Sequence, residues 1–188
     1  MPYPNADYAA TNLGFGPRNL TSYLAQLYLR RRLNTIHGEL YNPEKPQLDP
    51  LNAKPGTATD RLMNWIKGQL TPKSVPELFQ WDLNDPPAKD VLSARLRAKY
   101  WGAQVIAHRP FIQRILDTNY KYFVESRATP MGDGSNPQNG NPPSPEFSRE
   151  TIDYAKMGIQ ALVESTRAFH NVEDKRFVVT NVFGTAHA

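Results

Sequence analysis

Cysteine is absent from this chain of 188 residues. Its absence excludes disulfide bonds and every zinc site that is built from thiolate ligands. Long apolar runs are missing too, since no stretch approaches the ~18 residues that a membrane-spanning helix needs. The first residues also lack the charged and then apolar pattern of a signal peptide. We therefore expect an intracellular, soluble chain without membrane contact and without a disulfide framework.

Sequence motifs of known chemistry are missing as well. No pair of histidines has the i,i+4 spacing of a helical zinc site, and no glycine–lysine phosphate loop or nucleophile elbow occurs. Gly14-Phe15-Gly16 lacks the third glycine and the preceding strand of a dinucleotide-binding loop. The four histidines are His37, His108, His170 and His187. We therefore predict no metal, no cofactor and no catalytic residue, so that the chain is not an enzyme.

Positive charge is in modest excess, with a formal net charge of +4 at pH 7. The densest basic region, Lys89–Arg114, holds six basic residues and one acidic residue. Its Arg95, Arg97 and Lys99 fall between apolar stripes of a predicted helix, where such residues usually pair with carboxylates or extend their stems to solvent. Binding to nucleic acid needs charge that is clustered on an exposed face. We therefore expect no direct DNA binding by this chain.

The stretch from Val91 to Phe111 organises the rest of the chain. Placed on a helix, it carries two apolar stripes, which lie on opposite faces at about 100° per residue. One stripe is Leu92, Leu96, Tyr100, Ala103 and Ala107, and the other is Val91, Ala94, Ala98, Trp101 and Val105. A helix that is apolar on two sides is usually central, so we expect other helices on both sides. Pro110 has no N–H for the helix, which predicts a kink or a restart before a continuation to about Phe123.

Four further segments have the apolar spacing of helices, and each follows or begins with a side chain that can cap a first turn. The most regular of them follows Ser148. Its apolar side, which we expect to face the core, consists of Ile152, Ala155, Ile159, Leu162, Thr166 and Phe169. The other segments are Leu20–Leu40 after Asn19, a short helix from Thr59 or Asp60 to Leu70, and Asp174–Ala188.

Irregular connections hold most of the 17 prolines. Residues 1–18 are predicted to be a tail, and residues from about 125 to 147 a disordered insertion, because this insertion has almost no large apolar side chain. In the Pro-rich segment Thr71–Pro87, we expect four side chains to anchor the loop to the core: Leu78, Phe79, Trp81 and Leu83. The predicted fold is all-α, an irregular helical domain (19–188) around a central buried helix, with long Pro-rich loops.

Four segments of the sequence resemble a known family in the same order. The run RLRAKYWGAQVIAHRPF (Arg95–Phe111) is similar to an "LRxRYYGAxxxxxRPF" stretch, and YLAQLYLRRRLNTIHGELY (Tyr23–Tyr41) to a preceding "LRxxLNxIHxxLY" stretch. YAKMGIQALVESTRAFH (Tyr154–His170) and VVTNVFGTAHA (Val178–Ala188) resemble the segments that follow. These stretches belong to the regulatory middle homology region of fungal six-cysteine zinc-cluster transcription factors.

The resemblance implies an all-helical, non-enzymatic regulatory domain in the nucleus. Such a domain would control transcription through contacts with protein partners or with the rest of a transcription factor. The six cysteines of the DNA-binding cluster are absent, and so are the basic linker and the coiled coil that normally follow it. The resemblance therefore implies a fragment, an incomplete domain without its zinc cluster. Because its core would lack cover, we expect the isolated chain to be marginally stable and to self-associate.

Two alternatives belong to other functional classes. The same scaffold could form a helical pocket that senses a small molecule, with Tyr100, Trp101 and His108 as the candidate lining. Alternatively, the chain could be a helical enzyme of a type that its motifs do not reveal. That function would require a cleft with titratable groups whose pKa values are strongly shifted.

Overall fold

The computed structural model describes residues 16–45, 48–128 and 145–173. Within these ranges the regular structure is helical and no strand occurs, which confirms the predicted all-α class. The elements are α2 (Pro17–Tyr41), α3 (Ala58–Gln69), the 3₁₀ turns η1 (Pro72–Ser74) and η2 (Glu77–Phe79), α4 (Val91–Ala128) and α5 (Arg149–Arg167). The predicted last helix, Asp174–Ala188, lies outside the described residues.

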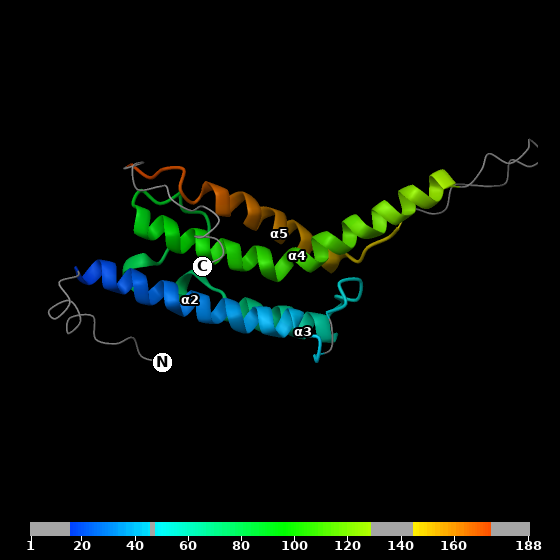
Figure 1. Cartoon of the computed structure of the whole chain (residues 1–188), viewed down its shortest axis with the longest axis horizontal. Coiled ribbons are helices and arrows are strands. Elements are labelled where there is room, and N and C mark those ends of the chain that lie inside the picture. The colour runs from blue at the N-terminus through cyan, green and yellow to red at the C-terminus, as the bar shows by residue number, and fades with distance from the viewer. Residues whose placement is uncertain (1–15, 46–47, 129–144, 174–188) are drawn as a thin grey trace, which may run out of the picture.

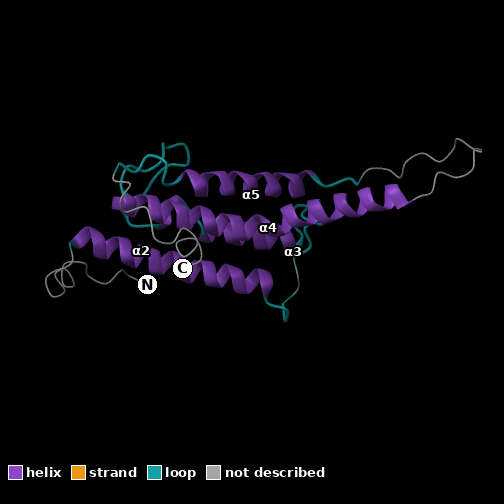
Figure 2. Cartoon of the chain, turned by 45° about the horizontal axis from the view of Figure 1, so that its top comes forward, coloured by secondary structure: helices purple, strands orange, loops and turns teal. Residues whose placement is uncertain are grey.

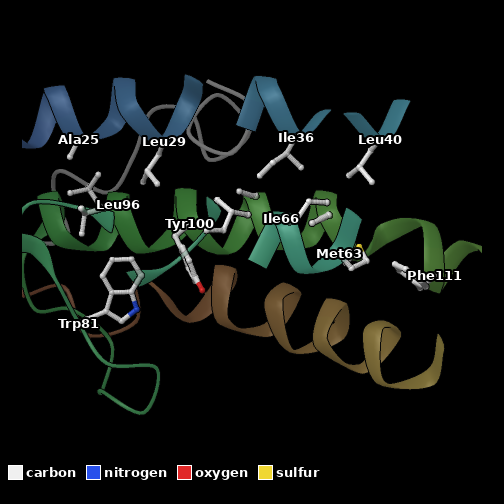
Figure 3. Packing of buried hydrophobic residues seen from close by; sticks show 14 of the residues in the cluster. Ala25, Leu29, Ile36, Leu40, Met63, Ile66, Trp81, Leu96, Tyr100 and Phe111 are labelled. Carbon is white, nitrogen blue, oxygen red and sulfur yellow. The ribbon is translucent and has the colours of Figure 1, made fainter. Parts of the chain in front are cut away.

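Helix α4 lies between α2 on one side and α5 on the other (Figures 1 and 2). It packs against both of these helices, which confirms that the doubly apolar helix is central. Helices α2 and α4 run in the same direction, while α3 and α5 run in the opposite direction (Figures 1 and 3). The second half of α4 extends beyond the ends of the other helices (Figure 1).

The start of α4 is fixed by Asp90. Its Oδ1 accepts hydrogen bonds from the backbone N–H groups of Leu92 and Ser93, both at 3.1 Å, so two free donors of the first turn are satisfied. The helix continues through Pro110 without the restart that was one of the two predicted outcomes, and its second half runs at an angle to its first half (Figures 1 and 2). It ends at Ala128, so the predicted insertion is wrong at its first four residues, which are helical. The rest of that insertion, up to residue 144, lies outside the described residues.

Helix α2 begins earlier than predicted, at Pro17 instead of after Asn19. Proline suits the first position of a helix because it has no N–H to leave unsatisfied and its φ is already helical. The carbonyl of Gly16 accepts the first backbone hydrogen bond, from Asn19 N at 2.9 Å. The predicted tail is therefore two residues too long at its end, and its residues 1–15 lie outside the described ranges.

The main core lies between α2, α3 and the first half of α4 (Figure 3). Leu29 and Ile36 of α2 are buried against α4, where Leu96 and Tyr100 belong to the first predicted stripe. Helix α3 starts at Ala58, slightly before the predicted start, because the side chain of Thr57 accepts a hydrogen bond from Asp60 N. It contributes Met63, Ile66 and, just past its end, Leu70 to the same core.

The Pro-rich loop between α3 and α4 is anchored by two of its four predicted side chains. Phe79 and Trp81 are buried, whereas Leu78 and Leu83 are exposed by 60% and 57%. The prediction was wrong for these two leucines. Successive residues of a 3₁₀ turn point about 120° apart, so η2 directs Phe79 into the core and its neighbour Leu78 to solvent.

Helix α5 packs on a face that is rotated from the predicted one: Ala155 and Phe169 pack in the core as predicted, but the large residues between them do not. Ser148 caps it as expected, accepting a hydrogen bond from Thr151 N at 3.2 Å. The face that meets α4, however, consists of small residues: Thr151, Ala155, Gly158 and Ala161. A methyl group placed on Gly158 would lie 2.8 Å from Cδ1 of Ile112 on α4. The two helices thus approach too closely for large side chains, and Ile152, Ile159 and Leu162 remain outside.

Candidate functional site

Tyr100, the first predicted pocket residue, is a core residue with 3% of its surface exposed. Its ring makes edge contacts with Trp81, at 5.2 Å between centroids, and with Trp101, at 5.1 Å. The Nε2 group of Gln104 donates a hydrogen bond to the Tyr100 hydroxyl at 3.0 Å. Burial raises the pKa of Tyr100, and the bond to Gln104 partly opposes this. The hydroxyl therefore stays protonated at neutral pH.

His108, the second candidate, is also 3% exposed. Its Nδ1 lies 2.8 Å from the backbone carbonyl oxygen of Gln104, which can only accept, so Nδ1 carries the proton. Burial lowers the pKa of His108, and this hydrogen bond raises it to a smaller extent. The imidazole is consequently neutral at pH 7, with Nε2 unprotonated. Its ring centroid lies 6.0 Å from that of Tyr154 on α5.

A small cleft between α3, α4 and α5 contains His108. Its volume is about 100 Å³, whereas sites for small organic ligands usually occupy roughly 300–1,000 Å³. The lining consists of Met63, Asn64, Ile66, Lys67, Gln104, His108, Tyr154 and Met157. Tyr100 touches this cleft only indirectly, through its hydrogen bond with Gln104.

Trp101, the third candidate, lines a separate cavity together with Trp81 and Arg97. This cavity holds about 20 Å³, close to the ~10–15 Å³ that a single water needs. Trp81 Nε1 and Arg97 Nε are buried N–H groups without a hydrogen-bond partner. Both can only donate, so one water could accept from each of them. The structure thus places the three candidate residues at three different positions and does not bring them to one pocket.

Two basic side chains between the apolar stripes have distinct surroundings. Arg97 donates to the backbone oxygen of Pro86 at 2.6 Å, and its guanidinium lies 5.6 Å from the centre of the Trp81 ring. Burial lowers the pKa of Lys99, and the positive charges of Arg30 and Arg95 lower it further. Arg97 therefore holds the loop before α4 in place. Lys99, Arg95 and Arg30 lie close together where α2 meets α4.

Metal-binding and membrane-spanning features were sought across residues 16–45, 48–128 and 145–173. No three histidine or acidic side chains in these ranges gather closely enough to hold a metal ion. No helix there has both the length and the apolar character required to cross a bilayer.

An exposed side of α5 carries an apolar surface, and three of its four residues, Ile152, Ile159 and Leu162, had been predicted to face the core. We define the α5 ridge as Ile152, Ile159, Leu162 and Val163, which are exposed by 37%, 53%, 46% and 45%. Ile159 is three residues from Leu162 and four from Val163, so these side chains are neighbours on the helix surface. The row of small residues on the neighbouring face was the available signal that these large residues would not pack against α4.

The second half of α4 carries another exposed apolar surface. We define the α4 arm as residues 113–128; its exposed apolar side chains are Leu116, Tyr120, Phe123 and Val124, at 63%, 69%, 51% and 44%. The sequence predicted that the apolar pattern continues here with Ile115 and Leu116. Ile115 packs against the main core, whereas Leu116 is exposed.

No family model, curated protein or solved structure matches this chain. The resemblance to the regulatory region of zinc-cluster transcription factors therefore stays a prediction from the four quoted segments. The geometry of the described residues supplies the remaining basis for a functional proposal.

Proposed function

We propose that this chain is a non-enzymatic regulatory region of a fungal zinc-cluster transcription factor. In this proposal it acts in the nucleus through protein contacts and makes no direct contact with DNA. The single observation that carries the proposal is the α5 ridge, an exposed apolar row on a helix whose other face is tightly packed. The order of the four resembling segments supports the choice of family.

Because α5 is held firmly against α4, its exposed ridge is suited to binding another helix. Apolar side chains at i, i+3, i+4 and i+7 are the anchors by which one helix lies in a groove of a partner. Single exposed apolar residues are ordinary, but neighbouring ones mark interaction sites. Gly158 holds α5 close against Ile112 and His108 of α4, so the ridge is presented by a rigid support. We propose that its occupant is an amphipathic helix from elsewhere in the same transcription factor.

A reporter assay in fungal cells tests this function. The whole chain would be fused to an unrelated DNA-binding domain, and the change in reporter output would be compared among variants. Ile159→Glu should abolish the effect, because a carboxylate in the middle of the ridge opposes docking. Leu78→Glu is the matched control, since Leu78 is 60% exposed in η2 and is not part of the α5 ridge. It should keep the effect.

The two variants should also have the melting temperature of the parent chain, because both replaced residues are exposed. A fusion without any effect on the reporter would contradict the regulatory function. A regulatory effect that survives Ile159→Glu would contradict the role of the α5 ridge.

A further inference from the structure

One hydrogen bond shows how α2 and α4 are aligned along their length. The Tyr41 hydroxyl donates to the backbone oxygen of Ile106 at 3.2 Å. The two helices run in the same direction (Figure 1), so residues that precede this contact by equal numbers of positions lie side by side. Eleven residues make about three helical turns, with a net rotation of only about 20°. Arg30 on α2 therefore lies next to Arg95 on α4, on the flank where the two helices meet.

A third cation lies at the same place. Lys99 follows Arg95 by four residues, so the two side chains are neighbours on the surface of α4. The positive charges of Arg30 and Arg95 both lower the pKa of Lys99, in addition to the larger effect of its burial. We call Arg30, Arg95 and Lys99 the basic triad. Arg30 and Arg95 are exposed and Lys99 is partly exposed, so a ligand can reach all three side chains.

The basic triad has no counter-charge in the described part of the chain. None of its members forms an ion pair or a side-chain hydrogen bond there. Arg97 on the same helix, by contrast, donates to the backbone oxygen of Pro86 at 2.6 Å. No acidic residue occurs on α2 before Glu39, and none occurs on α4 before Asp117. The triad is therefore a concentration of positive charge that favours an anionic ligand.

The charge and the donors of the triad favour a phosphate group over a carboxylate. A carboxylate would neutralise only one of the three cations, whereas a phosphate monoester carries a charge of about −1.5 to −2 at pH 7 and has three acceptor oxygens. The two guanidinium groups can each offer paired N–H donors to such oxygens, and the lysine adds a compact charge. Nucleic acid is usually bound by charges that follow its backbone. The triad is instead a compact group, which suits a single phosphate.

We propose that the basic triad is a binding site for a phosphate monoester, which a protein partner presents on a phosphorylated serine or threonine. Clusters of basic side chains are a common means of recognising phosphorylated proteins. The site lies where α2 meets α4 and is separate from the α5 ridge. It rests on the proposed function only in that the partner is a protein. Its test measures binding by the chain alone, so its failure is distinct from a failure of the reporter assay.

Titration of the whole chain with inorganic phosphate, followed by NMR at constant ionic strength, gives the first test. Backbone signals of the triad should shift in a saturable way, with half-saturation in the millimolar range because the ligand is so small. Arg30→Gln should weaken this binding by about tenfold or more, since it removes a charged hydrogen-bond donor. Arg114→Gln removes the same charge from the exposed α4 arm and should bind like the parent. Equal affinities of the two variants, or the absence of a saturable shift at the triad, would overturn the proposal.

The melting temperature in phosphate-free buffer provides a readout that is independent of binding. Arg30→Gln should keep or raise the melting temperature of the parent, because it relieves repulsion within the triad and replaces an exposed residue. A clear decrease would mean that Arg30 stabilises the fold through a partner of its own, and this result would contradict an unneutralised anion site.

Two further probes distinguish the sources of the phosphate group. A short neutral peptide with one phosphoserine should shift the same signals, compete with inorganic phosphate and lose affinity in Arg30→Gln, whereas its unphosphorylated form should not shift them. Binding of inorganic phosphate without binding of the phosphopeptide would identify a free anion as the ligand and overturn the proposal. A short DNA duplex that binds the triad more tightly than the phosphopeptide would identify nucleic acid as the ligand and would likewise overturn it.

Discussion

The two halves of α4 have similar apolar spacing but opposite surroundings. In the first half, Leu96 and Tyr100 are 0% and 3% exposed, whereas Leu116 and Tyr120 in the arm are 63% and 69% exposed. Helices α2 and α5 flank the first half, and the arm extends beyond them (Figure 1). Spacing thus indicates which sides of a helix are apolar. It does not indicate whether another element of the same chain covers them.

The largest expected contrast is between two tyrosines of this one helix. Tyr100→Ala should lower the free energy of unfolding by about 3–5 kcal/mol, because it leaves a cavity beside the rings of Trp81 and Trp101. Tyr120→Ala should change it by less than about 0.5 kcal/mol, as is usual for exposed sites. Urea denaturation of both variants would measure the contrast. Similar losses for the two variants would mean that the arm is part of the core.

A smaller contrast is expected between two helical glycines. Gly102→Ala should stabilise the chain by about 0.5–1 kcal/mol, because alanine favours helix and nothing lies within 4 Å of the added methyl group. Gly158→Ala gains the same helix propensity, but its added methyl group would lie too close to Ile112 and His108. Such overpacking costs about 1–3 kcal/mol. The net result should be a loss of up to about 2 kcal/mol. Thermal melts that show stabilisation by both changes would refute the close contact of α4 and α5.

The buried His108 should give a still smaller, pH-dependent effect. Its folded pKa lies below its ordinary value of 6.5, so below about pH 6.5 the unfolded chain binds more protons than the folded one. Stability should therefore fall as the pH drops from 6.5 towards 5, where carboxylates begin to contribute. His108→Gln should flatten this part of the profile, measured by urea denaturation at each pH. An unchanged slope in the variant would exclude His108 as its source.

The central helix could be predicted because it carries apolar residues on two opposite faces. Such a helix has few alternatives to a buried position. Helix α5 was predicted as a helix, but its buried face is rotated from the predicted one and shares only Ala155 and Phe169 with it. Its large apolar residues have the more regular spacing in the sequence. The close contact with α4 at Gly158, however, leaves room only for small residues on the face that packs against α4. Sequence periodicity weighs side chains by hydrophobicity, while helix packing also depends on how near two backbones can come.

The candidate site shows the same limit of sequence reasoning. Tyr100, Trp101 and His108 lie on one helix at spacings that do not reveal which cavity each one faces. The structure separates them, with Tyr100 in the core, Trp101 beside Arg97 and His108 in the cleft with Gln104. Conversely, the apolar residues of the α5 ridge and the α4 arm could be recognised in the sequence. Only the structure shows that their side chains are exposed.

The orientation of α5 is the central claim, because the proposed function depends on an outward ridge. Thiol labelling measures it directly in a chain that has no cysteine. Ile159→Cys, at a position that is 53% exposed, should react with a thiol reagent in the folded chain almost as fast as in denaturant. Ala161→Cys, at a fully buried position facing α4, should be strongly protected. Rapid labelling at 161 with protection at 159 would contradict the account.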